Sequence, residues 1–428
     1  MKRFVWSELS ADERRAALAR PRRRRDGEVS AIVRRIFDEV EAEGEAAVRR
    51  WSLALDKRAP QRLELTPNLV AAARAAVTSE DIAALDLAVA NVRRFHEATK
   101  PASRDIEIQA GVRCRREWRA IGACGLYIPG GSAPLFSTLI MLAEPARVAG
   151  VRERIALTPP GAGEAPHPMM IAAAAACGLD ALWLVGGAQA IAALSFGAGL
   201  PRAEKIFGPG NAYVTEAKRY AASLAGGPVI DVPAGPSELM VIADDAANAR
   251  IVAADLLSQA EHDPDAQVIL VATSETIVNA VAAELAKQTP SLPRAEIAQA
   301  SLAQARLIRA RDAAEAAEIA NAYAPEHLSL QIAAPQALVP RLDNAGAVFV
   351  GAWSAETFGD YICGPSHVLP TDGAARAWSG VSVASFMKSF TVQEMNDIGA
   401  RALAPGAARL ARLEGLEAHA RAADARLQ

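Results

Sequence analysis

An acid and an imidazole stand side by side at Glu326 and His327, within the stretch NAYAPEHLSLQIA at residues 321–333. Both side chains can accept a proton near neutral pH when their surroundings shift their pKa values, so the pair is suited to general-base catalysis. Neighbouring residues of an extended chain point to opposite sides, so the two could flank one substrate only if the chain bends there. The alternative is a pair with no chemical role, because most acid-imidazole neighbours are not catalytic.

A metal site is indicated by the sequence QAEH, which places Gln259 three residues before His262. On an expected helix this spacing lets both side chains project from one face toward a common point. With a carboxylate such as Asp360, an amide oxygen and an imidazole nitrogen would suit zinc with an open coordination position. A histidine at a helix end is also often a capping residue, so a purely structural role remains open.

Three glycine-rich segments, at residues 125–135, 184–194 and 207–218, each place glycine at an expected strand-to-helix turn. At such turns backbone N–H groups and a helix N-terminus favour an anion such as a pyrophosphate. A standard dinucleotide fingerprint and a P-loop are both missing from the sequence, since it contains no GxGxxG after the first strand and no GxxxxGK[ST]. Glycines that only allow tight turns are the alternative.

The other histidines give less information about function. His96 is expected on a helix surface and His167 in a loop between prolines, and neither is assigned any chemistry.

Short apolar runs alternate with amphipathic ones from about residue 120 onward, which is typical of parallel sheets covered by helices. The sequence therefore predicts an α/β fold with two Rossmann-like parallel-sheet domains and small helical segments at the two ends of the chain. The expected divisions are an N-terminal helical segment at 1–24, a discontinuous first α/β domain at 25–123 and 237–375, a second α/β domain at 124–236, and a C-terminal helical tail at 376–428.

Two packing expectations follow from these divisions. The mostly helical region before residue 120 should pack onto the unit at 237–375, through the amphipathic pattern of SAIVRRIFDEVEAEGEAAVRRWS. The tail should be helical from SFTVQEM at residues 389–395 to the end, and, lacking an apolar core of its own, it should dock on another surface.

Composition excludes several classes of protein. The 428 residues are 51% apolar and 22% charged with a net charge of -3, which gives no reason to expect nucleic acid or an anionic membrane as a partner. The basic run RPRRRRD at residues 20–26 favours a solvated surface over a nucleic-acid tail. No secretory signal opens the sequence, so a cytoplasmic protein is expected. The four cysteines show no CxxC spacing and are expected to be reduced.

Taken together, the segments resemble the histidinol dehydrogenase family along essentially the whole chain. The matching motifs are long, and they are GLYIPGGSAPLFST, VGGAQAIAAL, KIFGPGNAYVTEAKR, DVPAGPSE, DLLSQAEHDPDAQVIL, NAYAPEHLSLQ, GDYICGPSHVLPT and EGLEAHARAADAR. The resemblance implies a homodimeric zinc enzyme that oxidises L-histidinol through the aldehyde to L-histidine, using two NAD in succession.

Residue roles carry over from the same resemblance. It implies that Glu326 and His327 are the general bases. It implies one zinc ion per subunit, held by Gln259, His262, Asp360 and His419, and cofactor contacts at Tyr127, Gln189 and Asn211. Substrate contacts are implied at Ser237, Gln259, His262, His327, Asp360, Glu414 and His419. The resemblance gives His367 no role except as a neighbour of the site.

The resemblance also implies that the tail crosses to complete the partner subunit's site. Glu414 and His419 are five residues apart, which does not put them on one helix face, so a bend or helix end is expected near Gly415.

Three rival functions remain. The nearest is a related zinc and NAD dehydrogenase that oxidises another small polar alcohol, such as a sulfonated diol, to the acid; a panel of substrates separates the two. A zinc hydrolase in which Glu326 activates a metal-bound water leaves the three glycine-rich turns unexplained. A non-catalytic metal-binding protein requires the Glu326–His327 pair to be incidental.

Overall fold

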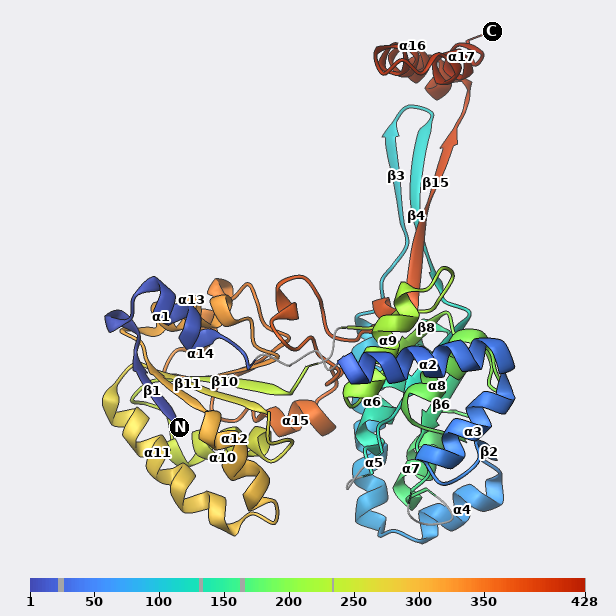
Figure 1. The fold of residues 1–428 in the computed structure, drawn as a ribbon. Helices are drawn as coiled ribbons and strands as arrows, with labels where there is room; N and C mark the ends of the chain where they lie inside the picture. Colours follow the sequence, from blue (N-terminus) through green and yellow to red (C-terminus); the bar gives the residue numbers. More distant parts are fainter. Residues whose placement is uncertain (22–26, 131–133, 162–165, 233–234, 428) are drawn as a thin grey trace.

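Two α/β lobes, a long β arm and a helical tail make up the chain (Figure 1). The computed structural model describes residues 1–21, 27–130, 134–161, 166–232 and 235–427. Parts of three motifs singled out in the sequence therefore lie outside the described residues: 22–26 of the basic run, 131–133 of the first glycine-rich segment, and 233–234 of DVPAGPSE.

Lobe 1 is built on a six-stranded sheet that is parallel throughout, in the order β1-β12-β11-β10-β13-β14. Its strands are β1 (Lys2–Val5), β10 (Glu238–Ala243), β11 (Gln267–Ala272), β12 (Arg306–Arg309), β13 (His327–Gln331) and β14 (Ala347–Val350). Strand alternation divides its apolar side chains between two cores, with Leu239 and Val241 on one face and Met240 and Ile242 on the other.

Helices cover both faces of this sheet. The first face is packed by α10 (Ala249–Ala260), α11 (Glu275–Gln288) and α12 (Ala295–Gln304), and the second by α1 (Ala11–Leu18), α13 (Ala313–Tyr323) and α14 (Pro335–Leu338). A further short helix, α15 (Glu356–Tyr361), packs against α10.

Lobe 2 is built on a second six-stranded sheet, in the order β2-β7-β6-β5-β8-β9, which is parallel except at the β2–β7 edge. Its strands are β2 (Gln61–Glu64), β5 (Ala123–Tyr127), β6 (Glu153–Thr158), β7 (Ala181–Leu184), β8 (Lys205–Phe207) and β9 (Val229–Ile230). One face is covered by α5 (Ser79–Ala98), α6 (Phe136–Ala149) and α7 (Pro168–Ala176), the other by α2 (Gly27–Glu43), α3 (Glu45–Leu55), α8 (Gly187–Phe196) and α9 (Ala212–Ser223), while α4 (Pro67–Ala75) packs on α7.

The predicted α/β class is confirmed, but the expected grouping of the N-terminal region is wrong. Of the residues 25–123 expected to join 237–375, residues 27–98 belong to lobe 2 instead, because α2 packs on α8 and α9, α5 packs on α6, and β2 pairs with β7. Residues 104–120 form strands outside the sheets of both lobes. Residues 1–24 contain β1, which instead extends the sheet of lobe 1. An amphipathic pattern shows that a helix must bury one face, but not which sheet receives it.

The arm is a three-stranded antiparallel sheet formed by β3 (Arg104–Gln109), β4 (Val112–Ala120) and β15 (Met387–Met395). It carries the tail helices α16 (Asp397–Leu413) and α17 (Glu417–Asp424) away from both lobes (Figure 1). The expectation that SFTVQEM is helical is wrong, because these residues pair with β4. The expected break near Gly415 is confirmed: α16 ends at Leu413 and Gly415 has a φ of +76°.

A buried ion pair fixes the glycine-rich turn after β8. Lys218 pairs with Asp231, and both side chains are almost fully buried. Lys218 Nζ also donates to the Gly208 carbonyl at 2.7 Å, and the Gly208 N–H donates to Asp231 Oδ2 at 2.7 Å. Both backbone groups of Gly208, whose φ is +112°, are therefore held by one ion pair.

Removing one member of this pair should destabilise the fold strongly. We expect Lys218→Met to lower the free energy of unfolding by about 3 to 5 kcal/mol, because Asp231 is left as an uncompensated buried charge. The neighbouring Arg219→Met, which removes the exposed arginine of a surface pair with the partly buried Glu216, should cost less than about 1 kcal/mol. Urea unfolding of both variants measures the difference; equal losses would show that the buried pair has no special role.

No helix in the described ranges is long and apolar enough to cross a membrane. All four cysteines are free thiols, as expected. His96 departs from expectation: it is completely buried rather than on a helix surface, and burial lowers its pKa to about 4.

Candidate functional site

The chain bends just before β13, at the acid-imidazole pair. Helix α13 ends at Tyr323, Ala324 adopts a left-handed φ of +55°, and Glu326 lies in a bend that leads into His327, the first residue of β13. The bend brings Glu326 Oε2 to 3.6 Å from His327 Nδ1, and both side chains are buried. The condition for the two side chains to serve one substrate is therefore met.

Both side chains are held by the backbone of Glu238, at the start of the adjacent strand β10. Its N–H donates to Glu326 Oε2 at 2.8 Å, and its carbonyl oxygen lies 3.1 Å from His327 Nδ1. Since a carbonyl only accepts hydrogen bonds, Nδ1 must carry the proton in this contact. The lone pair of the neutral ring is then on Nε2, which is buried and has no hydrogen-bond partner among the residues that the structure describes.

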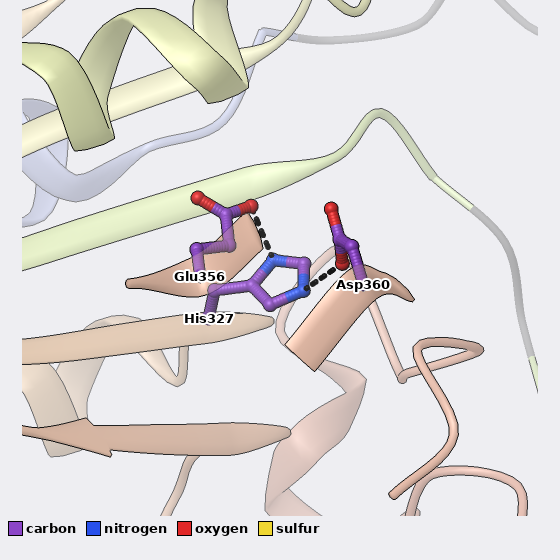
Figure 2. Close-up of side chains that lie close together, drawn as sticks. All are labelled: His327, Glu356 and Asp360. Carbon is purple, nitrogen blue, oxygen red and sulfur yellow. Dashed lines mark ion pairs between the residues drawn. The ribbon is translucent and has the colours of Figure 1, made fainter. Parts of the chain in front are cut away.

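Two carboxyl groups from α15 face the imidazole (Figure 2). Glu356 Oε1 lies 3.4 Å from His327 Nδ1, and Asp360 Oδ1 lies 3.8 Å from Nε2. Glu356 and Asp360 are four residues apart on the helix, so they share one face. Ligand atoms from these three residues all lie within 4.8 Å of one another, which is close enough to hold a metal ion.

Burial shifts the pKa values of the carboxyl groups and of the imidazole in opposite directions. Burial raises the pKa of the Glu326 carboxyl well above its ordinary value, and the charges of Glu238 and Asp360 raise it further. Burial also raises the pKa of Glu356, with Asp360 and Glu326 adding to the effect. Burial lowers the pKa of His327, so its ring is a neutral base at pH 7. Crowded, poorly solvated carboxyl groups favour a cationic ligand.

The expected metal ligands of lobe 1 lie around this cluster. Gln259 is in the last turn of α10, completely buried, and neither atom of its amide has a hydrogen-bond partner in the described part of the chain. An unpartnered buried amide is costly, which fits a group that binds a ligand. His262 lies close enough to His327 and His367 to lower the pKa of both, and α10 packs against α15, which carries Asp360.

The expectation that Gln259 and His262 share a helix is wrong. Helix α10 ends at Ala260, and His262 lies in the following turn, where its N–H donates to the Gln259 carbonyl at 3.2 Å. Pro264 follows closely, and the residue before a proline is disfavoured in helical conformation. The side chain of His262 is exposed.

Glu414 and His419 are not near this cluster within one chain. Glu414 caps α16 and His419 lies in α17, and both side chains are exposed. Figure 1 shows these helices at the far end of the arm, well away from α15. Within one chain, the tail that carries His419 therefore lies far from α10 and α15, which carry Gln259 and Asp360.

The expected cofactor residues gather at the carboxyl ends of the parallel strands in lobe 2. Tyr127 ends β5, and its hydroxyl accepts the N–H of Gly187 at 3.2 Å, at the start of α8. Gln189 Nε2 donates to Asp56 at 3.0 Å, and its buried Oε1 has no partner among the described residues. Asn211 caps the N-terminus of α9 with its side chain.

The strand order of lobe 2 explains why these residues meet. The chain runs outward from β5 to β6 and β7 on one side, then resumes on the other side at β8 and β9. A crevice forms at such a switch point, outside the carboxyl ends of the strands, and α/β folds bind ligands there. Helix N-termini at α8 and α9 supply positive dipole ends suited to a pyrophosphate.

His367 connects the two lobes. Its Nδ1 lies 2.8 Å from the Asp360 carbonyl in lobe 1, and its Nε2 lies 3.2 Å from Thr138 Oγ1 on α6 of lobe 2. The acid-imidazole pair of lobe 1 and the switch point of lobe 2 are thus on two lobes that make direct contact beside Asp360. Ser237 immediately precedes β10 and is half-buried.

Sequence reasoning missed Glu356. Two carboxylates stand four residues apart in SAETFGDY, which could have indicated a shared helix face. Only the fold shows that this short helix lies opposite His327.

Comparisons with known proteins match the chain along almost its whole length. The family model described as histidinol dehydrogenase matches residues 19–427. The histidinol dehydrogenase of Yersinia pestis is 44% identical over 423 residues, covering 99% of this chain and 95% of that protein. That of Salmonella typhimurium is likewise 44% identical, covering 99% and 96%. The crystal structure of histidinol dehydrogenase from Elizabethkingia anophelis superimposes with a TM-score of 0.95 at 40% identity, covering 100% of this chain and 98% of that one.

Proposed function

The chain belongs to the histidinol dehydrogenase family, and from this we propose that it oxidises L-histidinol through L-histidinaldehyde to L-histidine in histidine biosynthesis, reducing two NAD. The observation that carries the proposal is the buried pair of Glu326 and His327, held at one bend by the backbone of Glu238. Two proton-accepting groups at one point suit a reaction that needs two different proton abstractions.

In the first oxidation His327 is the base. Its Nε2 accepts the hydroxyl proton of histidinol while the hydride on the same carbon passes to NAD. The Nδ1–H bond to the Glu238 carbonyl keeps the lone pair on Nε2, and burial keeps the ring neutral and able to accept.

In the second oxidation Glu326 is the base that deprotonates a water molecule. The resulting hydroxide adds to the aldehyde carbon and gives an alkoxide, which takes the proton that His327 accepted in the first oxidation and so becomes the hydrate. His327 is then neutral and can accept a hydroxyl proton as the second hydride leaves for NAD. The raised pKa of the Glu326 carboxyl makes its ionised form a stronger base than an exposed carboxylate.

The donor groups fit one zinc ion per subunit. We propose Gln259, His262 and Asp360 as its ligands from one chain and His419 from the partner's tail in a homodimer, because the Gln259 amide is buried without a partner and a nitrogen and oxygen donor set suits zinc. When bound, zinc would orient the amine and imidazole of the substrate and polarise the reacting oxygen. Glu414 and Ser237 are proposed further substrate contacts, and Tyr127, Gln189 and Asn211 the contacts to NAD.

The direct test is NADH formation by the purified protein with L-histidinol. Two equivalents of NADH per histidinol support both steps. A panel with other small alcohols, including sulfonated diols, decides the substrate; faster turnover of one of those would replace the proposal with a related dehydrogenase.

Metal removal should abolish turnover, and added zinc should restore it. We expect His262→Ala to bind zinc at least roughly ten-fold more weakly, because one of few protein ligands is lost. His167→Ala, which alters a loop histidine, is the matched control and should bind zinc normally. Equilibrium dialysis measures zinc per chain independently of activity. Full activity of the metal-free protein would contradict this site, whereas loss of thermal stability alone would indicate a structural metal.

A further inference from the structure

Arg20 opens the basic run that the proposed reaction does not use, yet its side chain is largely buried, at 15% exposure. Its Nε and Nη2 donate to the two carboxylate oxygens of Glu238, with Nη2···Oε2 at 2.7 Å. This bidentate contact is the geometry in which arginine binds a carboxylate most firmly. The Glu238 side chain is only 1% exposed, so the guanidinium is its principal counter-charge.

Glu238 connects this contact to the reacting groups. The backbone N–H of the same residue holds Glu326, and its carbonyl holds the proton-bearing Nδ1 of His327. A second backbone contact, from the Asp372 N–H to Glu238 Oε1 at 3.2 Å, fixes the carboxylate from the other side. The contacts that fix the Glu238 side chain therefore also restrain the residue whose two backbone groups orient both bases.

Arg20 also holds the chain that enters the bend. Its Nη2 donates to the carbonyls of Tyr323 at 3.1 Å and Ala324 at 3.3 Å, and its guanidinium stacks over the Tyr323 ring at 3.8 Å. Ala324 adopts a left-handed conformation that is unfavourable for a residue with a side chain, so it persists only where its surroundings impose it. One guanidinium thus fixes both segments on which the bases depend.

We propose that Arg20 is a positioning residue that orients Glu326 and His327 through the backbone of Glu238 and the end of α13. This rests on the proposed function of those two bases. It differs from a role in attaching the N-terminal segment alone, because that role would affect stability without altering turnover by the folded enzyme.

The test compares Arg20→Ala with Arg376→Ala in the zinc-loaded enzyme. Arg376 is an exposed arginine that also donates to the Tyr323 carbonyl, at 3.4 Å, and no described contact joins its side chain to Glu238, so it is the matched control. We expect Arg20→Ala to lower kcat by roughly 10- to 100-fold, because small displacements of catalytic groups are costly. The KM for histidinol should change less than about three-fold, since Arg20 does not contact substrate. Arg376→Ala should keep both values.

Two further measurements separate positioning from loss of fold. Added methylguanidinium should restore part of the kcat of Arg20→Ala and none of any loss in Arg376→Ala. In the double variant with Glu238→Gln, the two losses in kcat should be clearly less than multiplicative, because both remove the same contact. If Arg20→Ala does not fold, Arg20→Lys carries the test, and it should be intermediate because lysine cannot bind bidentately.

The outcomes are distinct. Unchanged kcat in folded Arg20→Ala, or equal losses in the two alanine variants, would overturn the inference. Full kcat in folded Arg20→Lys would do the same. Absence of NADH formation by the wild-type protein would instead refute the proposed function, whatever the variants do.

Discussion

Replacement of His327 by asparagine is expected to slow both oxidation steps by roughly 10²- to 10⁴-fold, the usual contribution of a positioned general base. Asparagine can still donate a hydrogen bond to the Glu238 carbonyl as Nδ1–H does, but it has no basic nitrogen in place of Nε2. Each step is measured separately, with histidinol for the first and added histidinaldehyde for the second. A variant that retained the rate of either step would show that His327 is not its base.

Glu326→Gln should separate the two steps. The amide oxygen of glutamine can still accept the Glu238 N–H, so the bend and His327 should keep their positions. Only the aldehyde step requires water to be deprotonated, so we expect it to lose roughly 10²-fold or more while alcohol oxidation loses much less. Equal losses in the two steps would refute this division between the bases. Unfolding measurements should confirm that both variants remain folded.

The bend at Glu326 and His327 is a feature that the sequence predicts only in part. Adjacency of Glu326 and His327 made a kink necessary for joint action, and the structure has one. What imposes it could not be anticipated, because the supporting contacts come from Arg20 and Glu238, which are 306 and 88 residues away from Glu326 along the chain. Long-range polar contacts leave no periodic pattern in a sequence. Buried strands such as β10 and β11, in contrast, can be recognised as continuous apolar runs.

The arm could not be predicted from the sequence for a related reason. β3 does alternate Ile106 and Ile108 with polar residues, but the pattern is short and all of its side chains are exposed, and β4 carries arginine at four of its nine positions. Neither strand therefore gives the sustained signal of a half-buried strand. The sequence predicts that the residues of β15 belong to the helical tail, because the segment from SFTVQEM to the end is rich in alanine and charged residues. These strands are specified by pairing with one another over long sequence distances rather than by burial on one face.

The placement of Glu414 and His419 at the end of this arm leads to a strong prediction about assembly. Two groups of large apolar side chains are exposed: Leu410, Leu413 and Leu416 in the tail, and Trp353, Phe358 and Tyr361 in and near α15. Exposed apolar groups of this kind, one at α15 and one in the distant tail, favour a second chain as their cover. We propose that the tail of each subunit docks beside Asp360 of its partner.

Two inactive variants should then restore each other. His262→Ala damages the lobe 1 part of a site, and His419→Ala damages the tail. When they are unfolded and refolded together at equal concentration, half of the dimers are mixed. In each mixed dimer one site has both defects and the other has none, so about a quarter of wild-type activity should return.

A second mixture controls for subunit exchange and refolding. His262→Ala combined with Asp360→Ala places both defects in lobe 1, so every site of the mixed dimer retains one defect, and this mixture should stay inactive however the tail is shared. If instead His419 serves its own chain, the first mixture stays inactive as well, because every site then carries one damaged ligand. Absence of activity in the mixture of His262→Ala and His419→Ala, with the heterodimer demonstrated by mass spectrometry, would exclude a site shared between subunits. Recovery in the first mixture alone can arise only if the tail supplies His419 across the interface.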